Sequence, residues 1–330
     1  MMSIAEPIQI GQALNRDGVL NLNKPAGWTS HDVVARLRKV LGVRKIGHAG
    51  TLDPPATGVL PILVGKGTRV AELLIDWDKE YEAVLRLGQV TETQDGTGTV
   101  VLERSTQNLK EETIRSVVAQ FQGRLRQIPP MYSAIKIGGT PLYKMARAGR
   151  TVERPARWIT VQQIEIQSIQ GRDVSFRVAC SKGTYIRTLC DDIGERLGVG
   201  GHLLHLVRTR VGPLHVGQAV SLDDVERESA LSEGSFSFLS LDVVLGSLPA
   251  VVVDPEAVPR ALNGALVPVS ALSGEFGRIL PDATEGKMFR VKDEGGRLLG
   301  LGKTSLHARD DCESAGWFSM VKVFVARSTS

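Results

Sequence analysis

Residues 48–61 contain the side chain best placed to do chemistry, the carboxylate of Asp53. Asp53 stands directly before Pro54, and a residue before proline is restricted to extended conformations. Gly50 and Gly58, on either side, allow the backbone to turn tightly and to approach a ligand closely. The pattern therefore predicts a stiff loop that presents one carboxylate. The alternative is an ordinary turn in which Asp53 hydrogen-bonds to its own backbone.

A second stretch, residues 181–189, contains Tyr185 and Arg187. If the start of this stretch is extended, both side chains point to the same side of the chain. A guanidinium beside Asp53 would favour the ionised carboxylate and orient it. The alternative is a surface Arg187 that pairs with Asp191, four residues further along a helix.

A third candidate is Tyr81, which follows Lys79 and Glu80. Its ring could stack on a nucleobase or its hydroxyl could take part in proton transfer, but such a tyrosine is also typical of a strand that packs on a core. Residues 65–68 (Gly-Lys-Gly-Thr) lack the spacing of a phosphate-binding loop, so no nucleoside triphosphate site is expected. His202 and His205 have no nearby carboxylate pattern, and we expect no metal site there.

The elements that must position these residues mix strands and helices without a regular βαβ repeat. Residues 19–23 and 81–87 have the patterns of strands, and Thr29 or Ser30 is a suitable N-cap for a helix whose apolar positions run from 33 to 41. We expect a loop from Gly42 to about Pro61, further helices near 70–74, 114–121 and 189–197, and two strands joined near 171. This mixture predicts an α+β fold with a largely antiparallel sheet.

Positive charge is concentrated in residues 124–157, which hold eight basic residues and one acid. A solvated basic face is one interpretation, but the density of one sign favours a loop that contacts phosphates. The whole chain of 330 residues has a net charge of +4, which alone is weak support for a nucleic-acid partner.

Length and composition favour two domains. The chain becomes rich in Ser and Gly between about 229 and 248, and short strand-like runs follow, with a tight turn at Gly295–Gly296. We therefore predict a domain over residues 1–248 and a small β-rich domain over 250–330. The N-terminus lacks a signal-peptide pattern, and the three widely spaced cysteines are interpreted as buried reduced thiols, so a cytoplasmic location is expected.

These stretches, in this order, resemble the TruB family of tRNA pseudouridine synthases, which modify uridine 55 in the TΨC loop. The resemblance covers residues 18–212, and its motifs are residues 18–30, 48–61, 79–81, 87–88, 127–136, 142–147, 182–187 and 206–212. It implies a pseudouridine synthase fold with flanking helices, and a PUA-like RNA-binding domain in the tail.

The resemblance also implies roles for individual residues. The catalytic residues are then Asp53, its arginine partner Arg187, and Tyr81, which packs on the target base and is the candidate base for the final proton loss. The substrate-binding residues are then His48, which helps to hold the RNA loop, Tyr185, Leu206 in the uracil pocket, Lys24 beneath the active-site loop, and Lys136 and Arg147 in the basic segment.

The implied reaction isomerises uridine to pseudouridine without adding or losing atoms, so it requires no cofactor and no metal. The expected partner is the TΨC stem-loop of tRNA, and the expected oligomeric state is a monomer. Pro55, Gln94 and Val207 depart from the family pattern, since relatives often carry a larger apolar residue, Thr or Ser, and a basic residue at these places. Two alternatives are an RNA-binding or RNA-folding protein without essential catalysis, and a pseudouridine synthase that acts on another RNA.

Overall fold

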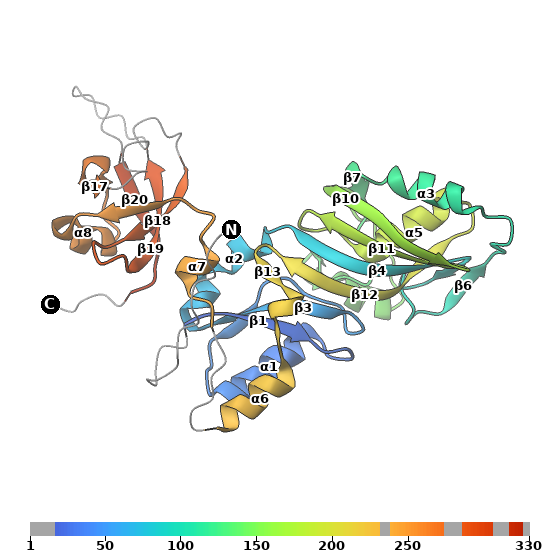
Figure 1. Cartoon of the computed structure of the whole chain (residues 1–330), viewed down its shortest axis with the longest axis horizontal. Helices are drawn as coiled ribbons and strands as arrows, with labels where there is room; N and C mark the ends of the chain where they lie inside the picture. The colour runs from blue at the N-terminus through green and yellow to red at the C-terminus, as the bar shows by residue number, and fades with distance from the viewer. Residues whose placement is uncertain (1–16, 232–237, 274–285, 306–316, 326–330) are drawn as a thin grey trace. The chain divides into compact units, whose positions relative to one another are not determined.

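The computed structural model describes residues 17–231, 238–273, 286–305 and 317–325 (Figure 1). The chain forms two compact units. The larger is built from residues 20–63 and 70–236, and the smaller from residues 237–330 together with 64–69 and the N-terminal residues up to 19. None of the helices in the described ranges is long and apolar enough to cross a membrane.

A ten-stranded sheet forms the framework of the larger unit, and its main path runs β14-β1-β3-β12-β4-β11-β10-β7. The pairs from β12 through β4, β11 and β10 to β7 are antiparallel, whereas β12 with β3 and β1 with β14 are parallel. The predicted α+β fold with a largely antiparallel sheet is therefore confirmed. The strands are β1 (Gly18–Lys24), β2 (Ile46–His48), β3 (Thr57–Val64), β4 (Lys79–Leu87), β7 (Gly123–Gln127), β10 (Arg157–Gln170), β11 (Asp173–Cys180), β12 (Gly201–Val211), β13 (Leu214–His215) and β14 (Val220–Ser221).

One face of this sheet is apolar and is covered by two helices, α3 (Glu111–Ala119) and α5 (Ile186–Arg196). Strand β4 shows why, since Tyr81, Ala83 and Leu85 are buried while Glu82 between them is exposed. Burial of this face against the apolar stripes of α3 and α5 forms the main core. A separate hairpin, β5 (Gln89–Thr91) and β6 (Val100–Glu103), stands beside it.

A second pair of helices, α1 (Ser30–Leu41) and α6 (Leu222–Ala230), lies side by side below β1 in Figure 1. Thr29 is the N-cap of α1, as predicted, and it forms a capping box with Asp32. Arg36 joins the two helices through a bidentate pair with Glu226, at 2.6 and 2.7 Å. A 3₁₀ turn at Gly65–Val70 leads into α2 (Ala71–Ile75).

The expected loop from Gly42 to Pro61 is wrong in extent. Strand β2 forms inside it, and β3 begins at Thr57, so the irregular segment around Asp53 runs only from residue 49 to residue 56. The reason is that residues 57–64 form a strand with buried residues along almost its whole length, a run that periodicity alone does not reveal.

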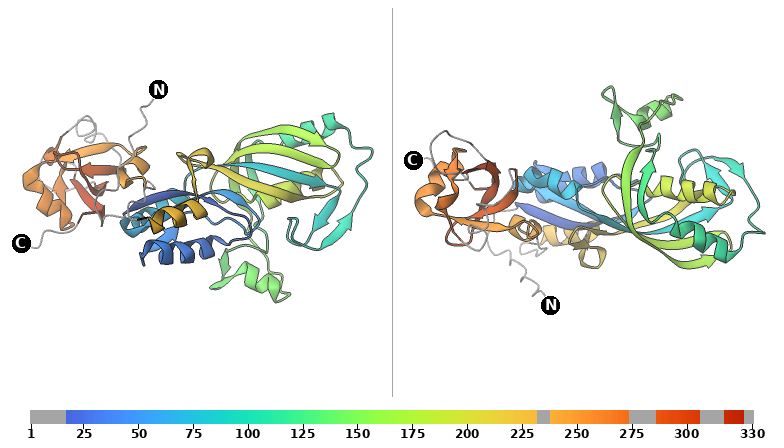
Figure 2. Two further views of the ribbon diagram at one scale, coloured as in Figure 1. Left: turned by 60° about the horizontal axis from the view of Figure 1, so that its bottom comes forward. Right: turned by 90° about the horizontal axis from the view of Figure 1, so that it is seen from above.

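The basic segment between β7 and β10 forms a small arm that projects from the larger unit (Figure 2). It contains a short hairpin, β8 (Lys136–Ile137) and β9 (Thr140–Pro141), followed by α4 (Leu142–Arg147). We call residues 128–156 the arm.

The smaller unit contains a six-stranded sheet in the order β16-β20-β19-β18-β15-β17. Its core includes Phe289 and Phe318, whose rings meet edge to face at 5.7 Å. The strand-like runs of the tail are thus strands, and Gly296 takes a positive φ in the turn between β18 and β19. The elements are α7 (Leu241–Val244), β15 (Ala250–Val253), α8 (Val258–Leu262), β16 (Val267–Pro268), β17 (Leu272–Ser273), β18 (Met288–Lys292), β19 (Leu298–Ser305) and β20 (Trp317–Val323), with 3₁₀ turns at Pro255–Ala257 and Val269–Ala271 here and at Val216–Gln218 in the larger unit.

Two of the three cysteines, Cys180 and Cys190, are buried free thiols, as expected. Cys312 lies outside the described residues. The PUA-like character of the tail and the domain boundary at 248–250 stay predictions, although α7 at Leu241–Val244 already belongs to the smaller unit.

Candidate active site

The loop that carries Asp53 is held by backbone contacts on both sides. The Ala56 N–H donates to the Asp53 carbonyl at 3.1 Å, and the Gly27 N–H donates to the Pro54 carbonyl at 2.9 Å. Ser30, at the start of α1, accepts from the Leu52 N–H at 2.9 Å. These contacts fix the backbone, while the Asp53 side chain remains 39% exposed.

Two buried cations hold the same loop from below. The Lys24 ammonium, with no exposed surface, donates to the carbonyls of Pro25, Trp28 and Pro54 at 2.8, 2.7 and 3.1 Å. Burial lowers the pKa of Lys24 to about 8. The residue that was expected to lie beneath the active-site loop does so, through the carbonyl next to Asp53.

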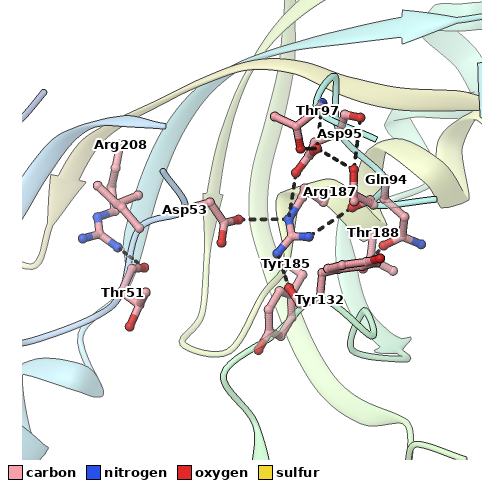
Figure 3. A network of polar contacts seen from close by, with 12 residues as sticks. Thr51, Asp53, Gln94, Asp95, Thr97, Tyr132, Tyr185, Arg187, Thr188 and Arg208 are labelled. Atoms are coloured by element: carbon pink, nitrogen blue, oxygen red, sulfur yellow. Dashed lines mark hydrogen bonds and ion pairs between the residues drawn. The ribbon is translucent and has the colours of Figure 1, made fainter. Parts of the chain in front are cut away.

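The second cation is Arg208 on β12, whose guanidinium is buried. It donates to the carbonyls of Val59, Gly50 and Thr51 at 2.7, 2.9 and 3.3 Å (Figure 3). The Arg208 charge also opposes the rise in the pKa of the Tyr81 hydroxyl. Because Arg208 also lies opposite Tyr81 in the pairing of β12 with β4, it joins the Asp53 loop to β4.

Arg187 reaches Asp53 from the first turn of α5, with 2.9 Å between its Nε and the Asp53 Oδ2 (Figure 3). Its other nitrogens donate to the carbonyls of Thr93 and Tyr132 at 3.0 and 2.8 Å. The expected extended start is wrong, because residues 182 and 183 form a turn, with a φ of 79° at Gly183, and the helix begins at Ile186 after its N-cap, Tyr185. The alternative partner, Asp191, is bound instead by a glutamine side chain, Gln94.

The start of α5 is fixed by a glutamine from β7. Gln127 is buried, and its Oε1 accepts from the Tyr185 N–H at 2.8 Å while its Nε2 donates to the Tyr185 carbonyl at 3.0 Å. An N-terminal helix N–H without such a partner would be left unsatisfied. Gln127 thus sets where the first turn of α5, and with it Arg187, is placed.

A second carboxylate, Asp95, lies beside the pair, with 3.8 Å between its Oδ2 and the Arg187 Nε. Its Oδ1 is held by the hydroxyls of Thr93 and Thr97, at 2.6 and 2.5 Å, and by the Thr97 N–H at 3.0 Å. Arg187 therefore lies between two carboxylates, of which only Asp53 is appreciably exposed.

Desolvation raises the pKa of Asp53 above its ordinary value, and the Asp95 charge adds to that rise. The Arg187 and Lys24 cations oppose it. Removing either cation would make the anionic carboxylate harder to maintain.

The two predicted tyrosines differ in environment. Tyr81 is buried, and burial raises its pKa to about 12, so its hydroxyl stays protonated at neutral pH. A neutral phenol is a weak proton acceptor, and this environment favours a packing role for Tyr81 over its predicted role as a base. Tyr185 is half-buried at the N-terminus of α5, where desolvation raises its pKa as well.

The Asp53 side chain lines a pocket of about 190 Å³. The pocket lies between residues 53–56, the turn of the β5–β6 hairpin at residues 95–97, and β12. Leu206, predicted to line the uracil pocket, is one of its wall residues. The wall combines the polar side chains of Asp53, Arg187 and Asp95 with apolar side chains, which suits a flat heterocycle with polar edges. The lining residues are Asp53, Pro55, Ala56, Asp95, Gly96, Thr97, Arg187, Leu203, Leu204, His205 and Leu206.

The remaining predicted residues lie outside this pocket. His48 ends β2, where burial lowers its pKa, and its buried Nδ1 has no hydrogen-bond partner among the described residues. Lys136 and Arg147 are exposed on the arm, and Arg147 lies over the Tyr143 ring at 5.7 Å. In the part of the chain that the structure describes, no cluster of three or more His, Cys, Asp or Glu side chains is arranged to hold a metal ion.

Comparison with known families agrees with this geometry. A model of the TruB family pseudouridylate synthase N-terminal domain matches residues 38–186, and one of the tRNA pseudouridylate synthase B C-terminal domain matches residues 187–252. The chain belongs to the TruB family. Asp53 lies within the first TruB match and Arg187 opens the second, so the ion pair joins the two parts.

The TruB relatives are similar over most of their length. The chain is 44% identical over 289 residues to tRNA pseudouridine synthase B of Burkholderia pseudomallei strain 668, covering 88% of this chain and 93% of the relative. It is 41% identical over 309 residues to tRNA pseudouridine synthase B of Clostridium kluyveri, covering 94% of this chain and 100% of the relative.

Two solved structures resemble this TruB protein in fold. A crystal structure of a Cbf5-Nop10-Gar1 complex gives a TM-score of 0.72 at 31% identity, covering 94% of this chain and 86% of that chain. The structure of an H/ACA RNP bound to a substrate RNA containing 2'-deoxyuridine gives a TM-score of 0.69 at 28% identity, covering 98% and 95%. The expected pseudouridine synthase fold is thus confirmed.

Three residues of this TruB site were not among those expected from the sequence: Arg208, Gln127 and Asp95. Each acts on a residue far away in the chain, so local spacing gives no sign of it. The available signal was their polarity, because a charged or amide side chain that is buried in the fold needs a polar partner.

Proposed function

We propose that the protein isomerises uridine 55 in the TΨC loop of tRNA to pseudouridine, with Asp53 as the catalytic carboxylate. The observation that supports this most directly is the ion pair of 2.9 Å between Arg187 and a partly exposed Asp53, at the edge of a pocket lined by Leu206. Membership of the TruB family supplies the reaction class.

The reaction breaks the bond between N1 of uracil and C1′ of the ribose and forms a bond between C5 and C1′. The proton on C5 is lost and N1 gains a proton, so the product has the same composition as the substrate. Asp53 acts as an anion, either by attacking C1′ or by taking a ribose proton, and both roles require the carboxylate that Arg187 stabilises.

The base must leave its stack to reach Asp53, at a cost of a few kcal/mol. Contacts to the RNA phosphates offset this cost. The exposed basic side chains of the arm, Lys136 and Arg147 among them, are available for such contacts. We propose that His48 helps to hold the RNA loop from which the uracil leaves. The ring of Tyr81 packs against the uracil in the site.

The test is an Asp53→Asn variant assayed on tRNA labelled with tritium at C5 of its uridines, because isomerisation releases the C5 hydrogen to water. We expect tritium release to be abolished while tRNA binding is retained. A matched control is Asp173→Asn, which breaks another arginine pair on the same sheet, with Arg86 at 2.7 Å, and should leave turnover unchanged.

An Asp53→Asn variant with near-normal turnover would refute the catalytic assignment. A wild-type protein that binds tRNA but releases no tritium would support instead an RNA-folding function. Release from tRNA carrying cytidine at position 55 would contradict the proposed target position.

A further inference from the structure

Gln94 has an unusual backbone conformation beside the active site. Its φ of 62° makes it the one residue other than glycine with a positive φ in the described ranges. It lies in the turn of the β5–β6 hairpin, where its N–H donates to the Thr91 carbonyl at 3.1 Å and its carbonyl accepts from the Leu203 N–H at 3.0 Å. A glutamine keeps this conformation only where surrounding contacts compensate for it.

The compensating contacts come from α5. The Gln94 Nε2 donates to the Asp191 Oδ2 at 2.6 Å. The Gln94 Oε1 accepts from the Thr188 hydroxyl at 2.9 Å, and Figure 3 shows these two residues. Thr188 and Asp191 are three residues apart and so lie on one face of the helix. One amide therefore ties the hairpin turn to the helix that carries Arg187.

The residues on either side of Gln94 both act on Arg187. The Thr93 carbonyl accepts from its Nη1 at 3.0 Å, and the Asp95 carboxylate lies 3.8 Å from its Nε. The turn cannot move relative to α5 without changing the contacts that orient the guanidinium toward Asp53.

Gln94 also occupies the carboxylate that Arg187 would otherwise reach on its own helix. Asp191 is four residues from Arg187, the spacing at which a helix brings opposite charges together. With its Oδ2 held by the Gln94 amide, Asp191 is satisfied by a neutral donor, and Arg187 remains directed at Asp53.

We propose that Gln94 is a positioning residue for the isomerisation: its side chain fixes the hairpin turn on α5 and keeps Asp191 from competing with Asp53 for Arg187. Relatives in the family often carry Ser or Thr at this position, and these side chains are too short to reach both Thr188 and Asp191. The inference rests on the proposed role of Asp53.

The first test is Gln94→Gly, because glycine accepts the positive φ and only the side-chain contacts are lost. We expect kcat for tritium release from tRNA to fall by about tenfold, while KM and the melting temperature stay close to wild type. The matched control is Gln107→Gly, a glutamine exposed in a loop, which should leave kcat unchanged.

A pH profile separates positioning from a general structural effect. The charged groups that act on Asp53 are Arg187, Asp95, Lys24 and Arg208. If Arg187 is less well directed in Gln94→Gly, the pKa of Asp53 rises, and the acid limb of kcat moves to higher pH. A structural loss of active enzyme would lower the plateau without moving the limb.

A rescue variant tests the competition. Adding Asp191→Asn to Gln94→Gly removes the competing charge, and we expect kcat to recover by severalfold over the single variant. Gln94→Asn, which tolerates the positive φ but has a shorter amide, should fall between wild type and glycine.

The proposal would be overturned if Gln94→Gly had the kcat and the pH profile of the wild type. It would also be overturned if the double variant with Asp191→Asn had a kcat no higher than that of Gln94→Gly. Both results leave the proposed function intact, because that function is tested separately, by the Asp53→Asn variant and by tritium release from the wild-type protein.

Discussion

Replacing Gln127 by leucine should lower both the free energy of unfolding and kcat, because it removes the amide that holds the start of α5. Gln127 is 4% exposed and makes two hydrogen bonds to the backbone of Tyr185, at 2.8 and 3.0 Å. Leucine has a similar size but can make neither bond, so the change removes polar contacts without opening a large cavity.

The magnitude follows from the two backbone groups that lose a partner. The Tyr185 N–H is left unsatisfied at a helix start, which costs about 1–3 kcal/mol. The Tyr185 carbonyl keeps the Leu189 N–H at 3.0 Å, so its loss is only the net value of one hydrogen bond, about 0.5–1.5 kcal/mol. Burial of the leucine side chain offsets about 1 kcal/mol of this. We expect the free energy of unfolding to fall by about 2 kcal/mol.

Two measurements check the prediction. Urea unfolding gives the change in stability, and kcat for tritium release gives the effect on Arg187, whose displacement by about 1 Å could slow turnover up to about 100-fold. The control is Gln163→Leu, the same change at an exposed position on β10, which should alter stability by less than about 0.5 kcal/mol. If Gln127→Leu were as stable and as active as this control, the assignment of Gln127 as the anchor of α5 would be wrong.

A second substitution gives the reasoning a pH signature. In Gln127→Glu one carboxyl oxygen still accepts from the Tyr185 N–H, but the other faces the Tyr185 carbonyl and can donate only when protonated. The folded state therefore raises the pKa of the new carboxyl above its unfolded value. Its stabilising contribution is fully present below the unfolded pKa and is lost as pH rises through the folded pKa. A stability difference from wild type that did not change with pH would contradict this account.

Three further outcomes are expected. Arg187→Gln removes the cation that opposes the raised pKa of Asp53, so activity should be lost at a higher pH on acidification than in wild type; an unmoved acid limb in a pH profile of kcat would argue against the pair. Arg208→Met leaves two loop carbonyls and the Val59 carbonyl of β3 without this donor and should lower kcat more than it changes tRNA affinity, whereas equal kcat would show that the loop holds its shape alone. Removing the charges of Arg147 and Arg150 should weaken tRNA binding and reduce its dependence on salt, and identical affinities at two salt concentrations would sink the phosphate-contact hypothesis.

Much of the architecture follows from local patterns that sequence reasoning can read. The alternation in β4 and the N-cap at Thr29 depend on residues within a few positions of each other, and the sequence predicted the first and offered Thr29 or Ser30 for the second. β3 was missed because its residues are almost all buried, so the alternation that marks a half-buried strand is absent.

The candidate site divides along the same line. The motifs that resemble the TruB family led to Asp53 and Arg187, and the structure brings the two together. Arg208 and Gln127 escaped prediction because their partners are separated from them by 149 to 158 and by 58 residues respectively. Such contacts depend on how the strands are ordered in the sheet, which local spacing does not encode.

The carbonyl of Tyr132 belongs to the arm, yet it accepts a hydrogen bond of 2.8 Å from Arg187. Under the proposed function, the arm that contacts the RNA and the guanidinium that stabilises the Asp53 anion are therefore in direct contact. An RNA that moves Tyr132 away from the sheet would break the hydrogen bond between its carbonyl and Arg187. An RNA that leaves Tyr132 in place would keep this hydrogen bond. If the proposed function holds, RNA binding by the arm and the orientation of Arg187 toward Asp53 depend on the same backbone oxygen.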